Sequence, residues 1–298
     1  MIRGAAVPVA AETGAGIAPA VLTATRWMTT VSALAVASVI TVLVCLQFGA
    51  ERIGIAEATA IVWRALQDGR LAAESAGSSA VILLEVRLPR LVLGFFVGGC
   101  LAAVGVTLQA LLRNPLADPY VLGVSGGAAL GASLAIVTGL SAAGAVWLPL
   151  SAFAGSILSL VLLYRIAATY GYLSVHTLLL AGVIINALFS ALIMFLTSLM
   201  DPTHAFRVLS WMLGALAAPD DIALAVVGSF LAFGGLLLGR QARALNLLTV
   251  GEDSARSLGV DVKHVKRTLL ITTALLTGAV VSVSGLIGFV GMAVPHAV

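Results

Sequence analysis

The run LVLGFFVGGCLAAVGVTLQALL, residues 91–112, contains no charged side chain and is bounded by Arg90 and Arg113. A helix needs about 20 apolar residues to cross the hydrocarbon core of a bilayer. The run is long enough for one crossing, and we therefore predict a transmembrane helix here. The same pattern, an apolar run between charged residues, recurs along the chain and decides its fold.

The composition of the whole chain excludes a soluble globular protein. Of its 298 residues, 60% are hydrophobic and 10% are charged, whereas soluble domains carry roughly 25% charged residues. So few charges cannot cover a water-facing surface. The net charge of +3 does not indicate nucleic acid as a partner, because the basic residues lie between apolar runs, where membrane topology explains them. Cys45 and Cys100 lie inside apolar runs and predict neither a disulfide framework nor a metal site.

The charge-free runs predict an all-α fold, a polytopic transmembrane helix bundle with seven full spans and a partial eighth. Residues 1–27, rich in Ala, Gly and Pro, predict a disordered cytoplasmic tail; Arg3 and Glu12 argue against a cleaved signal peptide, because they interrupt its apolar core. The segment 206–216 is too short to cross and is expected at the interface or as a re-entrant piece. The predicted spans are residues 28–48, 91–112, 120–138, 146–164, 173–199, 222–239 and 268–284, and the partial span is 285–298.

The basic residues orient the chain, because Lys and Arg are enriched in cytoplasmic loops. With the N-terminus inside, ten of the 16 Lys and Arg residues fall on the cytoplasmic side. We therefore expect a cytoplasmic N-terminus. The ten residues are Arg3, Arg26, Arg113, Arg165, Arg240, Arg243, Arg256, Lys263, Lys266 and Arg267.

None of the predicted spans contains Asp, Glu, Lys or Arg in its interior. Ion-coupled transporters usually carry ionisable residues at membrane depth, where they bind the ion or relay the proton. The pattern favours a pore driven by a separate protein, with a channel or a facilitator as alternatives. The intramembrane Gln109 and Asn186 are expected to hydrogen-bond between helices, and lining of a pathway is the other interpretation.

A short pattern that resembles intramembrane serine proteases, Gly123-Val124-Ser125-Gly126, occurs near the start of the third predicted span. His176 or His296 could be offered as the base. Such a site needs the serine and the histidine at one depth, with an oxyanion hole. The Gly and Ala residues around Ser125 favour close helix packing instead.

The longest predicted cytoplasmic loop, residues 240–267, indicates a helix-turn-helix. Glu252 and Asp253 suit the positive N-terminal end of a short helix. Gly259 can end that helix in a left-handed conformation, and Asp261 then begins a second one. The predicted apolar side of the pair consists of Ala255, Leu258, Val262 and Val265.

Two interpretations of this helix-turn-helix remain open on sequence alone. A two-helix cytoplasmic projection suits docking into a groove on a partner protein. The alternative is an interfacial loop that Lys263, Lys266 and Arg267 anchor on lipid headgroups.

Several ordered motifs closely resemble the permeases of ABC importers for iron-siderophores, haem and vitamin B12, the FecCD-type family. The match runs from about residue 28 to the end of the chain. The motifs are Arg87-Leu88-Pro89-Arg90, Gly105, QALLRNPLADP at 109–119, LGVSGG at 122–127, LLLAG at 178–182, WMLG at 211–214, GEDSARSLG at 251–259, and GLIGFVG at 285–291 with Pro295-His296.

The resemblance implies the fold of a type II ABC importer permease in a bacterial inner membrane, with no cofactor. Its implied partners are a cytoplasmic ABC ATPase, an extracytoplasmic substrate-binding protein, the lipid bilayer and a second permease subunit, in a homodimer or heterodimer. The loop 240–267 would hold the element that couples to the ATPase. The coupling residues that it implies are Gly251, Glu252, Asp253, Ala255, Arg256, Leu258 and Gly259.

Two further groups of residues acquire roles from the resemblance. Arg87 and Arg90 match arginines at the outer mouth that pair with carboxylates of the binding protein. A cytoplasmic turn would close the second span, because prolines cannot continue a helix, and contact with the ATPase is its other interpretation. The turn residues are Asn114, Pro115, Asp118 and Pro119.

The resemblance also implies that the permease domain, residues 28–298, is about two helices short, because family members usually have ten spans. The chain has no G-x-x-x-x-G-K-[ST] phosphate loop, so ATP hydrolysis would belong to a partner and we do not expect an enzyme. The predicted function is import of a ferric siderophore or a related chelate such as haem or cobalamin. A stand-alone secondary transporter or facilitator is the alternative.

Overall fold

The computed structural model describes residues 23–49, 51–68, 77–168, 174–217 and 219–297. These residues form helices joined by turns and short loops, and no strand occurs among them. In chain order the helices are α1 (Ala24–Gln47), α2 (Ile55–Asp68), α4 (Ser78–Val81), the π-helix η1 (Ile82–Arg87), α5 (Leu88–Leu112), the 3₁₀-helix η2 (Pro119–Leu122), α6 (Val124–Val137), the 3₁₀-helix η3 (Leu140–Ala142), α7 (Trp147–Ala167), α8 (Val175–Leu199), α9 (Pro202–Met212), α10 (Asp221–Arg240), α11 (Ala242–Val250), α12 (Glu252–Ser257), α13 (Val262–Ser284) and α14 (Val290–Ala297).

The chain divides into two compact units, residues 1–56 and 57–298. In the first unit, α1 is an apolar helix of 24 residues with Leu46 as its buried residue. Large apolar side chains such as Met28, Val36 and Val39 are more than half exposed. Exposure of so much apolar surface to water is unfavourable, so α1 fits the lipid-facing span expected near the N-terminus.

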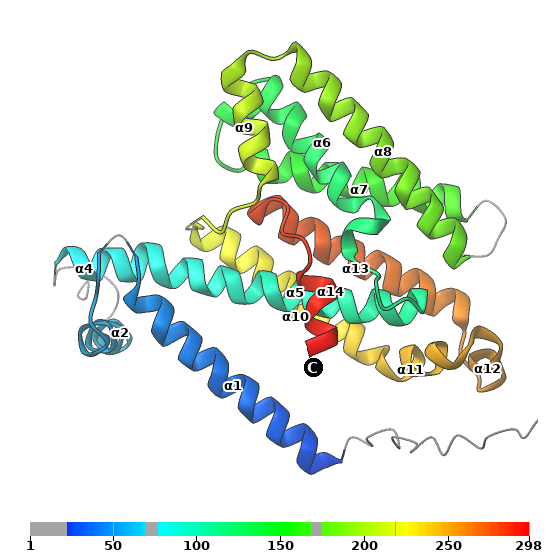
Figure 1. The fold of residues 1–298 in the computed structure, drawn as a ribbon, viewed down its shortest axis with the longest axis horizontal. Helices are drawn as coiled ribbons and strands as arrows, with labels where there is room; N and C mark the ends of the chain where they lie inside the picture. The colour runs from blue at the N-terminus through cyan, green and yellow to red at the C-terminus, as the bar shows by residue number, and fades with distance from the viewer. Residues whose placement is uncertain (1–22, 50, 69–76, 169–173, 218, 298) are drawn as a thin grey trace, which may run out of the picture. The chain divides into compact units, whose positions relative to one another are not determined.

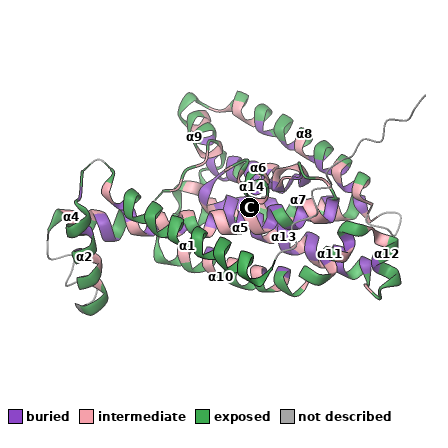
Figure 2. Ribbon diagram, turned by 60° about the horizontal axis from the view of Figure 1, so that its bottom comes forward, coloured by how far each residue is buried: buried purple, intermediate pink, exposed green. Residues whose placement is uncertain are grey.

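The second unit is organised around α13. Sixteen of the 23 residues of α13 are buried, and the helix packs on α5, α6, α7 and α10. Figure 1 shows α13 between two groups, with α6, α7, α8 and α9 on one side and α5 and α10 on the other. Figure 2 shows that burial concentrates on α13 and α5, whereas α8 turns a largely exposed side outward. The core of the bundle therefore follows α13.

Six helices in the described part of the chain are long and apolar enough to cross a bilayer: Ala24–Gln47, Ser78–Leu112, Trp147–Ala167, Val175–Leu199, Asp221–Arg240 and Val262–Ser284. They confirm six of the seven predicted spans. The remaining one, predicted at 120–138, is shorter than expected. Gly123 adopts a left-handed conformation, with φ +79°, and separates η2 from the 14-residue helix α6. The missing length is the stretch 119–122, which turns away as a 3₁₀-helix.

The helix that contains the run 91–112 is longer than its apolar part. It is continuous from Ser78 to Leu112, 35 residues, or about 52 Å at 1.5 Å per residue. The hydrocarbon core is only about 30 Å thick, and residues 91–112 account for that thickness. The N-terminal part, Ser78–Arg90, therefore projects beyond the core.

Glycines allow helices in the bundle to touch backbone to backbone. On α6, a Cβ at Gly127 would overlap the carbonyl of Gly155 on α7. On α5, a Cβ at Gly105 would overlap the carbonyl oxygen of Gly291 at the start of α14. Such contacts replace the hydrophobic effect, which does not hold helices together inside lipid.

We predict that Gly105→Ala destabilises the protein, by about 1–3 kcal/mol, because the added methyl forces α14 away from α5. Gly98→Ala on the same helix is the matched control, since a Cβ there meets nothing within 4 Å, and it should be neutral or slightly stabilising. Thermal unfolding in detergent measures both. Equal unfolding temperatures for the two variants would contradict the packing account.

Candidate functional site

A compact projection stands at one end of α10 and α13, formed by α12 and the turn that follows it. Glu252 and Asp253 occupy the first turn of α12, as the sequence predicts. Gly259 ends the helix with φ +85°. There the N–H of Val260 donates to the carbonyl of Ala255 at 3.0 Å, a bond that satisfies an otherwise unpaired helix-end carbonyl. We call residues 251–259 the knob.

The second helix of the predicted pair is α13 itself. Its N-cap is Asp261, whose carboxylate accepts from the N–H of His264 at 3.0 Å. The knob is thus joined to the most buried helix of the bundle by a turn of three residues, 259–261.

The apolar side of the knob differs from the prediction at one position. Ala255, Val262 and Val265 are buried, as expected, but Leu258 is 66% exposed. Leu258 follows the last turn of α12 as its C-cap, so it leaves the face that Ala255 shares with α13. A large apolar side chain that faces solvent at the tip of a projection is suited to a protein partner.

Charged residues of the knob form a small network. Glu252 accepts from Nζ of Lys266 at 2.5 Å, and Arg256 lies 3.5 Å from Asp253 and 3.9 Å from Glu252. Lys266 is only 5% exposed. It is therefore not available to lipid headgroups, which removes one of the three anchors that the interfacial-loop interpretation needs. A second anchor, Arg267, lies 5.7 Å from the centre of the Tyr164 ring.

The predicted turn after α5 is present. Arg113 ends α5 in a left-handed conformation, with φ 47°, and the side chain of Asn114 accepts from the N–H of Leu116 at 3.0 Å. Asp118 caps η2 by accepting from the N–H of Tyr120 at 2.9 Å. Burial raises the pKa of the Asp118 carboxyl above its ordinary value. Pro119 occupies the first position of η2, where a missing N–H costs nothing.

A polar hollow of about 480 Å³ lies between the end of α5 and the knob. Arg113 contributes from the end of α5, and Glu252, Asp253 and Arg256 contribute from α12. Arg113 and the knob are far apart in the sequence. The fold places them at one end of the bundle, where a single partner can touch both.

The two predicted docking arginines, Arg87 and Arg90, lie near the N-terminal end of α5, opposite to the end at Arg113. Arg90 is exposed, but Arg87, the last residue of η1, is only 8% exposed. A surface contact therefore fits Arg90 and not Arg87 in this conformation. Arg87 lies in the π-helix η1, whereas Arg90 lies in the first turn of α5. From Arg90 to Arg113 the helix rises about 35 Å.

Asn186 and Gln109 bridge elements, as the structural interpretation predicts. The side-chain amide of Asn186 donates to the carbonyl of Tyr120 at 2.8 Å, and that of Gln109 donates to the carbonyl of Met292 at 3.4 Å. Gly126 lies against Asn186, since a Cβ there would approach its side-chain oxygen within 2.5 Å. The Gly123–Gly126 segment is accordingly a helix-packing motif. In the described residues no hydrogen bond joins the buried Ser125 to a histidine.

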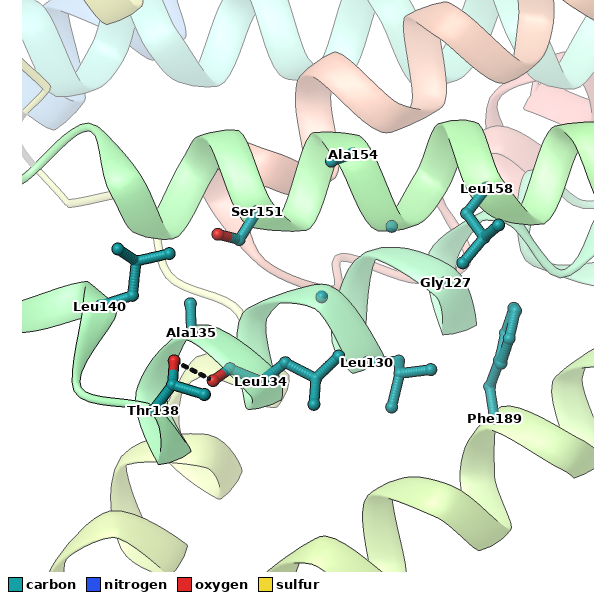
Figure 3. A pocket seen from close by; sticks show the side chains of 12 residues that line it. Gly127, Leu130, Leu134, Ala135, Thr138, Leu140, Ser151, Ala154, Leu158 and Phe189 are labelled. Atoms are coloured by element: carbon teal, nitrogen blue, oxygen red, sulfur yellow. Dashed lines mark hydrogen bonds between the residues drawn. The ribbon is translucent and has the colours of Figure 1, made fainter.

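An apolar groove of about 320 Å³ lies between α6 and α7. Figure 3 shows Leu130 and Leu134 from α6, Leu158 from α7 and Phe189 from α8 around it. Its lining is almost entirely apolar and contains no ionisable side chain. The groove thus lacks the polar groups that would recognise a charged chelate.

The short helix α9 is the predicted non-crossing segment, shifted to Pro202–Met212. Asp201 caps it by accepting from the N–H groups of Thr203 and His204 at 2.9 and 3.1 Å. Its carboxylate also contacts the ring of His204. These hydrogen bonds, the one from the His204 ring first, lower the pKa of Asp201 from 3.8 to about 2.

We predict that α9 loosens as the pH falls from about 4 towards 2. The folded-state pKa of Asp201 is depressed, so its stabilising contribution is present above the unfolded value of 3.8 and is lost as the pH falls to the folded value of about 2. Hydrogen exchange of residues 202–212, corrected for the intrinsic rate, measures the loosening. Asp201→Asn keeps a capping side chain without the charge and should remove most of the pH dependence of exchange in α9. If this variant kept the same pH dependence, Asp201 would not be its cause.

Comparison with known proteins places the chain in a class. The FecCD transport family matches residues 7–298. A solved structure described as an inward-facing conformation of a putative metal-chelate type ABC transporter has the same fold, with a TM-score of 0.75 and 28% identity; the match covers 91% of this chain and 80% of the other. A bundle with several membrane-crossing helices and this family match define a multi-pass inner-membrane transport component. The chain belongs to the FecCD transport family.

Individual relatives are similar over most of this chain. It is 41% identical to the cobalamin import system permease protein BtuC of Halobacterium salinarum, over 74% of this chain and 59% of the relative. It is also 41% identical to the hemin transport system permease protein HmuU of Yersinia pestis, over 72% and 65%. A probable iron chelatin transport system permease protein of Helicobacter pylori is 35% identical, over 88% and 78%. The chain spans about three fifths of the length of the first two.

Proposed function

We propose that this chain is a transmembrane permease subunit of an ATP-binding-cassette importer that moves a ferric siderophore or a related metal chelate, such as haem or cobalamin, into the cytoplasm. The observation that carries the proposal is the knob. Its apolar tip, Leu258, is 66% exposed, and its base continues directly into α13, the helix on which α5, α6, α7 and α10 pack. The cargo classes are those in the names of the relatives.

In this proposal, separate proteins carry out the other steps of transport. A cytoplasmic ATPase hydrolyses ATP, a substrate-binding protein delivers the chelate from outside, and a second permease subunit completes the pathway. The absence of charged side chains along the interior of the spans supports this division, because a proton- or ion-coupled carrier needs ionisable groups at membrane depth. This chain performs no chemical step of its own.

The geometry suggests how the chain takes part in transport. The N-terminus and the knob lie on the cytoplasmic side, in keeping with the excess of Lys and Arg on the loops of that side. The ATPase holds Leu258 and the exposed charges of the knob, and also reaches Arg113 across the polar hollow. When the ATPases close on ATP, the knob moves, and α13 carries the displacement to α5, α7 and α10.

We predict that Leu258→Asp abolishes co-purification of the ATPase, because it places a charge where an apolar contact is needed. The fold should be unaffected, since Leu258 is 66% exposed. Leu213→Asp is the matched control; Leu213 is 83% exposed at the end of α9, away from the knob, and this variant should retain the ATPase. Affinity purification of tagged complexes from membranes gives the answer.

Two results of that purification would count against the proposal. Retention of the ATPase by Leu258→Asp would contradict the role of the knob. Failure of the unmodified chain to bring down any ATPase would favour a stand-alone transporter or facilitator.

Arg90 supports the docking of the binding protein on the outer side. It is exposed, and it lies where the helix Ser78–Leu112 leaves the apolar run. An exposed ion pair contributes only about 0–1 kcal/mol, so its main effects are on orientation and association rate. Arg87 belongs to the same docking region but is buried in this conformation, so it would contact a partner only after a rearrangement of η1.

We expect Arg90→Glu to weaken binding of the loaded binding protein by about two- to fivefold, corresponding to less than 1 kcal/mol. The loss should be larger at low salt, because screening weakens the contribution of surface charges. The control is Arg243→Glu. Arg243 is exposed in α11, the helix before the knob, and this variant should bind the loaded binding protein normally. Surface plasmon resonance at two salt concentrations measures both, and an unchanged association rate for Arg90→Glu at low salt would exclude the contact.

A further inference from the structure

Lys266 is a buried lysine. Its charge does not fit an apolar span, and its burial does not fit an exposed docking surface. It is 5% exposed and lies in the second turn of α13. Burial of an ammonium group is unfavourable unless a partner of opposite charge is close. Its neighbour on the same helix, Lys263, is exposed and illustrates where a lysine at this end of α13 would ordinarily lie.

Glu252, fourteen residues earlier in the chain, forms an ion pair with Lys266. Its Oε1 lies 2.5 Å from the ammonium nitrogen, and the side chain of Glu252 is 28% exposed. Glu252 is the first residue of α12. The ion pair therefore joins the beginning of the knob helix to the membrane-embedded helix, at the end of the knob opposite to the Gly259 turn.

α12 packs mainly on α11 and makes fewer contacts with α13. α12 contains six residues, of which only Ala255 is buried. A methyl group buries little apolar surface, so α12 cannot hold its position on α13 through packing alone. The chain joins α12 to α13 through residues 259–261 and to α11 through Gly251. The Glu252–Lys266 pair is the contact that ties the first residue of α12 to α13.

We propose that the Glu252–Lys266 ion pair is a positioning contact that fixes α12 on α13, so that displacement of the knob by the ATPase is delivered to the core of the bundle. The inference rests on the proposed function and adds the contact through which force passes. A short, charge-assisted hydrogen bond is suited to this task because it is directional and allows one register between the two helices.

Loss of either charge should separate two activities that the intact transporter links. Without the pair, α12 keeps its exposed Leu258 and still binds the ATPase, but its first turn is no longer tied to α13 and moves with α11 when it is pushed. Hydrolysis then continues while α13 moves less. The expected signature is a fall in chelate taken up per ATP hydrolysed, with ATPase binding retained.

The test uses the whole transporter, assembled in proteoliposomes from this chain, its ATPase and its binding protein. Lys266→Met and Glu252→Gln are compared with Lys263→Met, the exposed control on the same helix. We expect each of the first two variants to lower the ratio of uptake to ATP hydrolysis about tenfold and the control to leave it unchanged. Glu252→Gln is nearly isosteric and partly exposed, so it provides an answer even where Lys266→Met folds poorly.

The double variant Glu252→Lys with Lys266→Glu reverses the pair and should recover most of the ratio. A merely structural role would not give this pattern: it would lower the unfolding temperature and the amount of assembled complex and leave the ratio of uptake to hydrolysis intact.

The outcomes separate the inference from the function on which it rests. If the unmodified chain assembles with the ATPase but Glu252→Gln and Lys266→Met transport with the same ratio as Lys263→Met, the positioning role is wrong and the proposed function stands. If the reversed pair stays as uncoupled as the single variants, the ion pair itself is not the contact. If the unmodified chain assembles with no ATPase, the proposed function fails and the inference fails with it.

Discussion

The burial of α13 among four other helices is the constraint on which the rest of the bundle depends. α5, α6, α7 and α10 all pack on it, and its first residues continue without a break from the turn that ends the knob. Close backbone contacts reinforce this arrangement; a Cβ at Gly278 would overlap the Ser156 hydroxyl of α7. Because packed helices resist small independent movements, a displacement at one end of α13 is felt by its neighbours.

This arrangement links two surfaces at opposite ends of the bundle. The knob and Arg113 lie at one end, and Arg90 lies about 35 Å along α5 at the other. α5 packs directly on α13, so both surfaces belong to one packed body. In the importer that we propose, this body would receive force from the ATPase at one end and would bind the loaded binding protein at the other, without ionisable groups inside the spans.

Features that depend on local sequence could be predicted from it. Six spans follow from runs without charge, and the left-handed Gly259 and the Asp261 cap follow from turn and capping preferences. Features that depend on distant neighbours could not. Leu258 leaves the apolar face because α12 ends one residue before it, Arg87 is buried at the end of η1, and the third span shortens where Gly123 turns. The pairing of Lys266 with Glu252 could not be predicted, because the two residues are fourteen positions apart and meet only through the turn between α12 and α13.

The central claim, that this chain is the membrane-spanning part of an ATP-driven chelate importer, is tested most directly by uptake into proteoliposomes. A labelled ferric siderophore, haem or cobalamin is offered with the binding protein outside, and ATP or a non-hydrolysable analogue is enclosed with the ATPase. We expect at least one of these chelates to accumulate, and only when hydrolysable ATP, the ATPase and the binding protein are all present. Equal uptake by the chain alone, driven only by the concentration gradient, would contradict it.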